Sequence, residues 1–254
     1  MSGVNAAVAS KEWRENAWKL AIGGGVAGAL AVLVPVAYDL LAPLLQGVEL
    51  PGALGEAVKR QLGDFRTYLW INWYGKNLYQ VLAVLAILLG MGTVAGEVSR
   101  RTSAFLLSRP LRRETVLRSK ALVGLAGLAG VAAGSTAVLV AASALAGYPV
   151  DPAWFLAGLP LAVAGSWAVY ALAVYASTMF DEPLKAGAAA FVVVLALGLP
   201  GWFRSTRVLS PFYHMKGLAV LEGAPAAWPG GLSLLLLAAL VYLLAERRLA
   251  DTDF

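Results

Sequence analysis

The sequence predicts an all-α polytopic membrane protein with six transmembrane helices, an N-terminal interfacial helix and a short cytoplasmic helix. Of its 254 residues, 59% are hydrophobic and only 14% are charged, whereas a soluble domain is about half apolar and about a quarter charged. The apolar residues come in runs of about 18 or more, which are long enough to cross about 30 Å of hydrocarbon. The alternating pattern of a membrane β-barrel is absent. Backbone groups in lipid must be satisfied internally, so each run is predicted to be a helix.

The whole chain, residues 1–254, is expected to form one transmembrane domain. The six predicted spans lie at about 20–45, 78–96, 120–147, 153–179, 186–203 and 229–246. The first is too long for the apolar core of a signal peptide, and no small-residue cleavage site follows it, so we expect it to be retained.

Residues 5–19 precede the first span and combine Trp13 and Trp18 with five charged residues. This composition favours a charged helix with interfacial tryptophans that lies along the membrane surface before the chain turns in. A short solvated tail is the alternative.

Two longer connections are expected on the outer side. The loop at 46–77 is too short for an independent domain, and the aromatic residues at 68–74 resemble a belt at the membrane interface. They could instead line a substrate exit. The loop at 204–228 mixes apolar and polar residues, which indicates short helices that dip into the outer leaflet.

Small residues recur in two spans and predict close helix packing. Gly24 and Gly28 lie in the first span, and Gly130 and Gly134 form a GxxxG pair in the third, after Gly124 and Gly127. Pro35 and Pro160 are expected to kink their helices.

The positions of the basic residues predict the topology. With the N-terminus inside, thirteen of the twenty lysines and arginines fall on cytoplasmic segments. The positive-inside rule therefore favours both termini in the cytoplasm. Topology accounts for the net charge of +5, and no nucleic-acid partner is indicated.

The densest charge lies at 97–122, where seven basic residues separate two apolar runs. Each would cost about 2.5–3.5 kcal/mol in hydrocarbon, so this segment is expected outside the bilayer. Pro110 disfavours helix at the residue before it. Ahead of this break, Val98, Thr102, Phe105 and Leu106 share one face of a short helix, and Ser108 lies largely off that face. Such a segment either transmits force from a cytoplasmic partner or binds anionic lipid through its charge.

A resemblance favours the first alternative. The sequence has Glu97, Thr102, a Leu-Ser-Arg-Pro motif at 107–110, then Arg113 and Lys120. This pattern resembles the signature of ABC-2 type transporter permeases. Three further segments resemble those of the family: the entry segment at 11–15, the loop at 210–214 and the charged ending at 245–251. Arg101 departs from the pattern, because the family usually has glycine there.

The resemblance implies a prokaryotic plasma-membrane (inner-membrane) permease subunit of an ATP-driven transporter. A second permease subunit, identical or related, would complete the pathway, and two ATPase subunits would bind beneath. This chain has no P-loop motif, so it would bind no cofactor itself, and ATP and Mg²⁺ would belong to the ATPase. Residues 98–108 would form the coupling helix, and the loop at 181–185 a second, minor contact. The residues expected at the junction are Glu97, Val98, Arg101, Thr102, Phe105, Leu106, Arg109, Pro110 and Arg113.

The implied activity is substrate movement, with export the expected direction, or maturation of an extracytoplasmic enzyme. The family exports lipids, polysaccharides, antibiotics and ions, and the motif does not choose among them. The chain itself is not expected to be an enzyme.

The alternative is an ATPase-independent intramembrane enzyme or a lipid-binding membrane protein. A serine enzyme needs a nucleophile and a base, but Ser135 and Ser166 lack the Gly-x-Ser-x-Gly arrangement. The single histidine, His214, is expected in an outer loop. The chain has no cysteine for a thiolate site, and no metal site is predicted. Asp39 is the one ionisable residue well inside an apolar run, and we place it near the interface.

Overall fold

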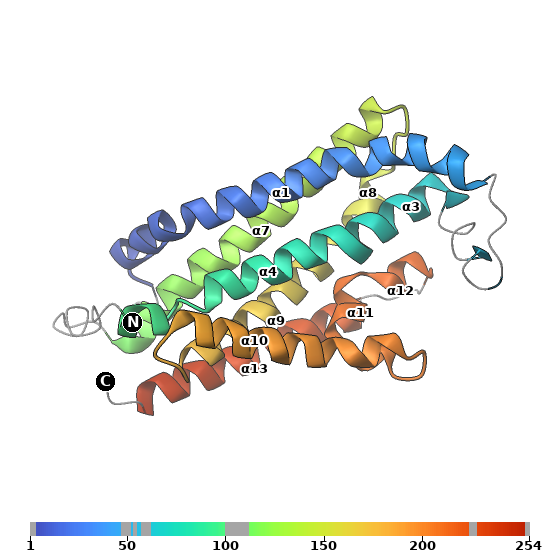
Figure 1. Cartoon of the computed structure of the whole chain (residues 1–254). Helices are drawn as coiled ribbons and strands as arrows, with labels where there is room; N and C mark the ends of the chain where they lie inside the picture. Colours follow the sequence, from blue (N-terminus) through green and yellow to red (C-terminus); the bar gives the residue numbers. More distant parts are fainter. Residues whose placement is uncertain are drawn as a thin grey trace.

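The structure, a computed structural model, describes residues 4–46, 52, 55–56, 62–99, 112–223 and 228–251. It is a bundle of long helices that run roughly side by side (Figure 1), and the described residues contain no strand. In chain order the helices are α1 (Ala6–Gln46), α3 (Phe65–Asn72), the π-helix η1 (Trp73–Asn77), α4 (Leu78–Gly90), α5 (Ala95–Ser99), α7 (Arg113–Leu145), α8 (Pro152–Leu156), α9 (Leu159–Ser177), α10 (Pro183–Gly198), the 3₁₀-helices η2 (Leu199–Trp202) and η3 (Arg207–Leu209), α11 (Pro211–Met215), α12 (Leu218–Leu221) and α13 (Trp228–Asp251).

Five helical segments of the described chain are long and apolar enough to cross a membrane. They correspond to the first, third, fourth, fifth and sixth predicted spans. The second predicted span is α4, which continues without a break from α3 through η1 (Figure 1). The π-helical turn leaves only thirteen residues of regular α-helix in α4. The all-α polytopic fold is therefore confirmed, whereas six membrane crossings stay a prediction.

Several helices extend beyond the predicted spans. α1 is one helix of 41 residues, so the expected N-terminal helix is continuous with the first span. α7 begins at Arg113 rather than near residue 120, and α13 continues to Asp251. Hydropathy places the end of each span where charged residues begin. The charged side chains of these helical turns form ion pairs with one another, so the turns remain helical.

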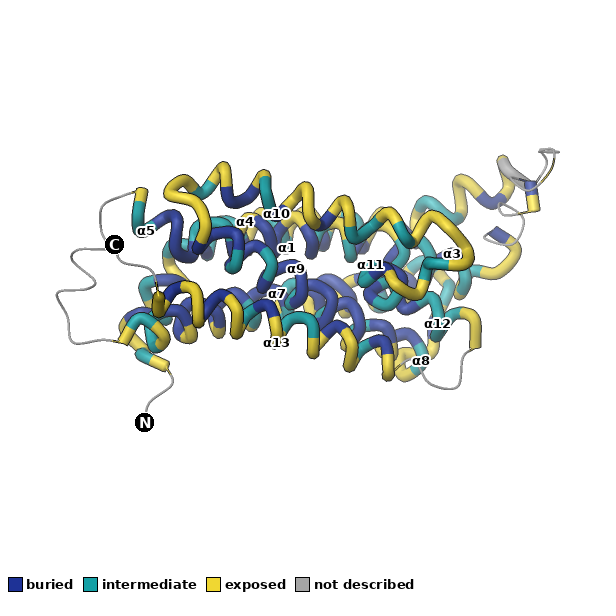
Figure 2. Tube along the Cα trace, turned by 90° about the horizontal axis from the view of Figure 1, so that it is seen from below, coloured by how far each residue is buried: buried dark blue, intermediate teal, exposed yellow. Residues whose placement is uncertain are grey.

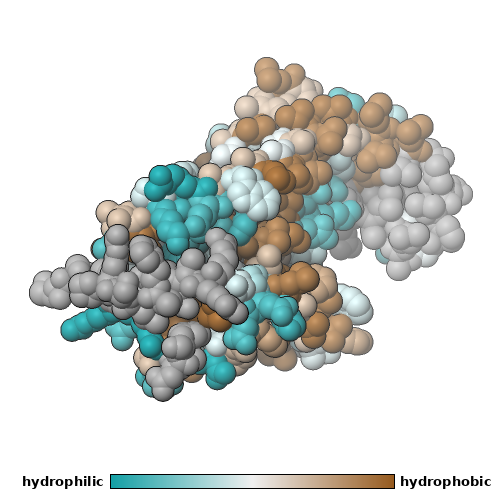
Figure 3. Space-filling view, turned by 60° about the vertical axis from the view of Figure 1, so that its left-hand side comes forward, coloured by the Kyte–Doolittle hydropathy of each residue, from teal (hydrophilic) through white to brown (hydrophobic). Residues whose placement is uncertain are grey.

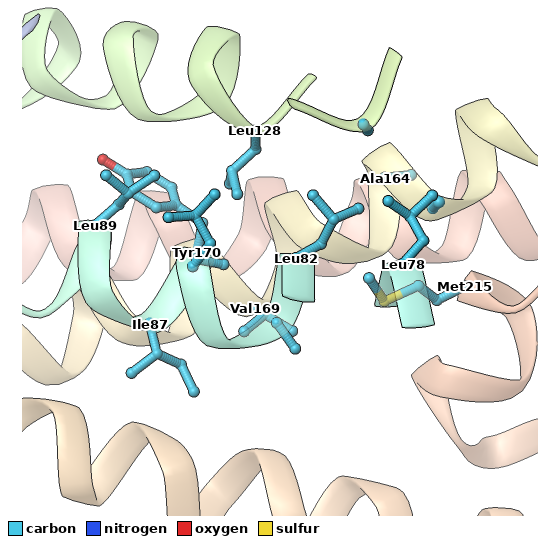
Figure 4. Packing of buried hydrophobic residues seen from close by; sticks show 14 of the residues in the cluster. Leu78, Leu82, Ile87, Leu89, Leu128, Ala164, Val169, Tyr170 and Met215 are labelled. Atoms are coloured by element: carbon cyan, nitrogen blue, oxygen red, sulfur yellow. The ribbon is translucent and has the colours of Figure 1, made fainter. Parts of the chain in front are cut away.

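The helix α9 lies at the centre of the bundle and packs against α4, α7, α10, α11 and α13. Its apolar stretch is 61% buried, against 22% in α10 and in α13. Tyr170 of α9 lies among leucines of α4 and α7 (Figure 4). Gly90 of α4 permits this packing, since an added Cβ would lie 2.6 Å from the Cβ of Ala173.

The outer surface of the bundle is largely apolar. Leu40, Leu195 and Leu236 are all well exposed, and exposed residues recur along the outer sides of α10 and α13 (Figure 2). In the space-filling view, apolar side chains extend behind the hydrophilic residues of the near end (Figure 3). A soluble monomer rarely exposes so large an apolar area, so these surfaces are suited to contact lipid.

The aromatic residues at 68–74 do not form an interfacial belt. Trp70, Trp73 and Tyr74 are completely buried. Their polar groups find partners inside the bundle: Trp73 donates to the Thr136 hydroxyl at 3.1 Å, and Tyr74 donates to the Phe155 carbonyl at 3.1 Å. Because each polar end is satisfied internally, these rings can fill the core instead of reaching for the headgroups.

Only some of the glycines in the glycine-rich spans allow close helix packing. A Cβ added at Gly124 would meet the Tyr170 ring at 2.6 Å, and one at Gly127 would meet Leu20 at 2.7 Å. The GxxxG pair of Gly130 and Gly134 has no such neighbour, because both residues line an open groove between α1 and α7. The expected close packing is therefore wrong for this pair within one chain.

The two prolines expected to kink helices lie in different settings. Pro35 lies inside α1, which continues past it, and a kink there stays a prediction. Pro160 lies in the first turn of α9, after a break between α8 and α9. A proline is tolerated there because the first helical turn needs no N–H donor. The short helices predicted at 204–228 are present as η3, α11 and α12.

Candidate functional site at the charged end of the bundle

The beginning of α1, the end of α13, α5 and the start of α7 lie at one end of the bundle (Figure 1). The Asn5 N–H donates to the Ser119 hydroxyl at 2.7 Å, which fixes the start of the chain to α7. Hydrophilic side chains gather at this end (Figure 3). It is therefore where the helices that flank the basic segment meet.

Lys120 is the centre of a buried ionic cluster at this end. Its Nζ lies 2.7 Å from Glu97 Oε1 and 3.3 Å from Glu12 Oε2. It also donates to the backbone carbonyl of Thr93 at 3.1 Å. The Lys120 side chain is only 5% exposed. One ammonium group therefore joins α1, α5 and α7.

The two carboxylates of the cluster have further partners. Asn16 Nδ2 donates to Glu12 Oε1 at 2.6 Å, one helical turn along α1. Lys11 Nζ lies 3.3 Å from Glu97 Oε1. Each of these glutamates thus has a lysine partner, and the hydrogen bonds reduce the cost of burying the charges.

The helix α5 is also fixed from the side of α9. The Ser177 hydroxyl accepts hydrogen bonds from the N–H groups of Val94 and Ala95, each at 2.9 Å. These donors lie at the start of a helix, where no intrahelical carbonyl is available. Val98 is half-buried and packs against the core. The chain that leads into the basic segment is therefore firmly held.

A second ion pair joins α7 to α13 at the same end. The Arg118 guanidinium donates to both carboxylate oxygens of Glu246, at 2.7 and 3.1 Å. Two parallel bonds of this kind fix orientation as well as charge. Arg113 Nη1 donates to the Leu249 carbonyl at the longer distance of 3.4 Å.

The structure brings together part of the predicted junction. Glu97, Val98 and Arg113 are described and lie at the charged end. The other predicted junction residues, Arg101, Thr102, Phe105, Leu106, Arg109 and Pro110, lie outside the described residues.

The sequence reasoning missed the role of Glu12 and Asn16. Val8, Glu12, Asn16 and Leu20 recur every four residues, and all four are buried. A polar pair on an otherwise buried stripe of a helix is the signal that could have shown that Glu12 faces an internal cation.

The residues considered for serine catalysis lie in different parts of the structure and have different hydrogen-bond partners. The hydroxyls of Ser135 and Ser166 donate to carbonyls of their own helices, at 2.6 and 2.7 Å. His214 Nε2 lies 2.8 Å from the Val208 carbonyl in the outer connection. These three side chains form no nucleophile–base pair with one another.

Asp39 is exposed near the far end of α1, and its position at the membrane interface stays a prediction. Its Oδ1 accepts a hydrogen bond from the Tyr148 hydroxyl at 2.6 Å. This hydrogen bond raises the pKa of Tyr148 above its ordinary value, because it favours the protonated phenol. The pair joins α1 to the turn after α7.

Comparison with known families found one match. A family model described as "ABC-2 family transporter protein" matches residues 8–202. The matched region includes Lys120, Glu97 and Glu12. A search of curated proteins found no match.

Proposed function

Because the chain belongs to the ABC-2 family of transporter proteins, we propose that it is a permease subunit driven by a separate ATPase. The ATPase would bind ATP and Mg²⁺, since the present sequence has no P-loop motif. The permease would convert the movement of its partner into a rearrangement of its transmembrane helices.

The buried cluster around Lys120 is the observation that supports this coupling best. The proposed coupling helix, 98–108, follows directly from Glu97. A displacement of this segment would move α5, and the ion pairs with Lys120 would pass the displacement to α7 and α1. Separating buried charges without a new partner is costly. The three helices would therefore move together.

The cluster refines the role of Glu97 within this proposal. Its carboxylate contacts Lys120 and Lys11 of the same chain. We therefore assign Glu97 to positioning the coupling helix rather than to direct contact with the ATPase. The arginines of the segment would make the charge-assisted contacts to the partner.

The proposed complex contains two permease subunits, identical or related, and two ATPase subunits. The basic end of the bundle would face the cytoplasm of a prokaryotic cell, with both termini on that side. The loop that contains the exposed Glu182–Lys185 ion pair, 2.9 Å long, would be the minor contact. Export, or maturation of an extracytoplasmic enzyme, is the activity proposed for the complex.

Phe105→Asp tests the proposed docking face. A carboxylate on the apolar face of residues 98–108 should abolish retention of the ATPase subunit during affinity purification. Ser108→Asp is the matched control, because residue 108 is predicted to lie largely off that face. The proposal predicts retention with Ser108→Asp and loss with Phe105→Asp. Equal retention by both variants would contradict the assignment.

A further inference from the structure

A lateral cavity lies in the half of the bundle far from the termini. It has a volume of about 400 Å³ and is lined by α4, α10, η2 and the connection that contains α11. Pockets of about 300–1,000 Å³ hold small organic ligands. Val84, Phe191 and Leu195 line it and are each about half exposed. The cavity therefore opens on the apolar side of the bundle.

The outer part of the cavity is polar and positively charged. Lys216 lines it, with Nζ 4.3 Å from the centroid of the Tyr79 ring. Within the part of the chain that the structure describes, no carboxylate pairs with this ammonium. The neighbouring Glu222 instead accepts two hydrogen bonds from Arg207, at 2.9 and 3.0 Å. Lys216 thus brings a net positive charge to an otherwise apolar cavity.

The backbone at Lys216 is fixed from the core. Its carbonyl accepts a hydrogen bond from the Nε1–H of the buried Trp70 at 3.1 Å. Gly217 follows with φ +61°, and a Cβ there would lie 2.9 Å from the Trp70 ring. Only glycine combines that backbone conformation with so close an approach. The hydrogen bond from Trp70 and the close packing of Gly217 on the Trp70 ring therefore fix the backbone at Lys216 beside the cavity.

Two further polar side chains line the same cavity as Lys216. Gln80 Nε2 donates to the Tyr79 hydroxyl at 3.4 Å, and both side chains line the cavity. The Tyr79 hydroxyl can still donate its own proton. A cation and hydroxyl and amide donors are the groups that bind a phosphate oxygen.

From this arrangement we propose that the cavity binds an anionic phospholipid of the surrounding bilayer. One acyl chain lies along Val84, Phe191 and Leu195, and the phosphate contacts Lys216. The lining of the cavity is complementary to such a lipid, because its side opening is apolar like an acyl chain and its outer end carries a cation for the phosphate. This proposal concerns the lipid around the chain and is independent of any ATPase.

Native mass spectrometry of the delipidated chain tests the proposal. Phosphatidylglycerol should bind more tightly than phosphatidylcholine with the same acyl chains. Lys216→Gln should weaken phosphatidylglycerol binding by about fivefold, the effect of one basic group at a lipid surface. Lys76→Gln is the control, since Lys76 is exposed and does not line the cavity. Equal effects of the two substitutions, or equal affinity for both lipids, would overturn the proposal.

Gly198→Leu provides a second test that keeps the charge. Gly198 lines the cavity, and a Cβ there meets only Phe212, at 3.7 Å. The Cβ therefore has room, and the rest of the leucine side chain is expected to fill the space proposed for the acyl chain. The phosphatidylglycerol affinity should fall although Lys216 is intact. Unchanged affinity would show that the lipid does not occupy the cavity.

Discussion

Lys120 shows how one residue can serve both stability and coupling. Its ammonium is almost completely buried and contacts a carboxylate of α1, a carboxylate of α5 and the Thr93 carbonyl just before α5. The family pattern predicted that Glu97 and Lys120 matter, since both belong to the motif. It could not predict that they contact each other, because side-chain pairing depends on how α5 and α7 approach.

Lys120→Met tests the importance of the cluster. The substitution removes the ion-pair partner that Glu12 and Glu97 share, so we expect a loss of about 3–5 kcal/mol in the free energy of unfolding. Unfolding in mixed micelles measures this loss. Lys185→Met removes the exposed pair with Glu182 and should change stability by no more than about 0.5 kcal/mol. Similar losses in the two variants would show that Lys120 is an ordinary surface lysine.

At the scale of elements, hydropathy predicted where the helices lie but not where they end or what they contact. The charged turns of α1, α7 and α13 pair with one another, so they remain helical beyond the apolar runs. The aromatic segment at 68–74 has the composition of an interfacial belt, yet its internal hydrogen bonds place it in the core. Composition alone cannot distinguish these outcomes, because both require an aromatic ring with one polar end.

The contact between α4 and α9 gives a prediction at this scale. Gly90→Ala places a Cβ 2.6 Å from that of Ala173 and 3.0 Å from the Tyr170 carbonyl, so the two helices must separate. We expect a loss of about 1–3 kcal/mol in the free energy of unfolding. Gly130→Ala is the matched control, since an added Cβ has no neighbour within 4 Å. If thermal unfolding shifts equally in both variants, α4 and α9 do not pack as described.

At the scale of the whole molecule, the fold, the charge distribution and the family agree. The bundle has an apolar outer surface and gathers charge at the end where α1 begins and α13 ends. The family match covers residues 8–202. The sequence motif predicted this family because its residues have the spacing that is typical of the family. The cavity at Lys216 could not be predicted, since it brings α4 against α10 and the outer connection, which follow it by about a hundred residues in the chain.

ATP hydrolysis by the purified complex tests the central claim most directly. The tagged chain, extracted in mild detergent from its native host, should co-purify with a P-loop ATPase, and the eluate should hydrolyse ATP. A variant in which the catalytic residues of that ATPase are inactivated should remain bound and show no hydrolysis. If the chain elutes without any P-loop protein and the eluate has no ATPase activity, it is not the ATPase-driven permease proposed here.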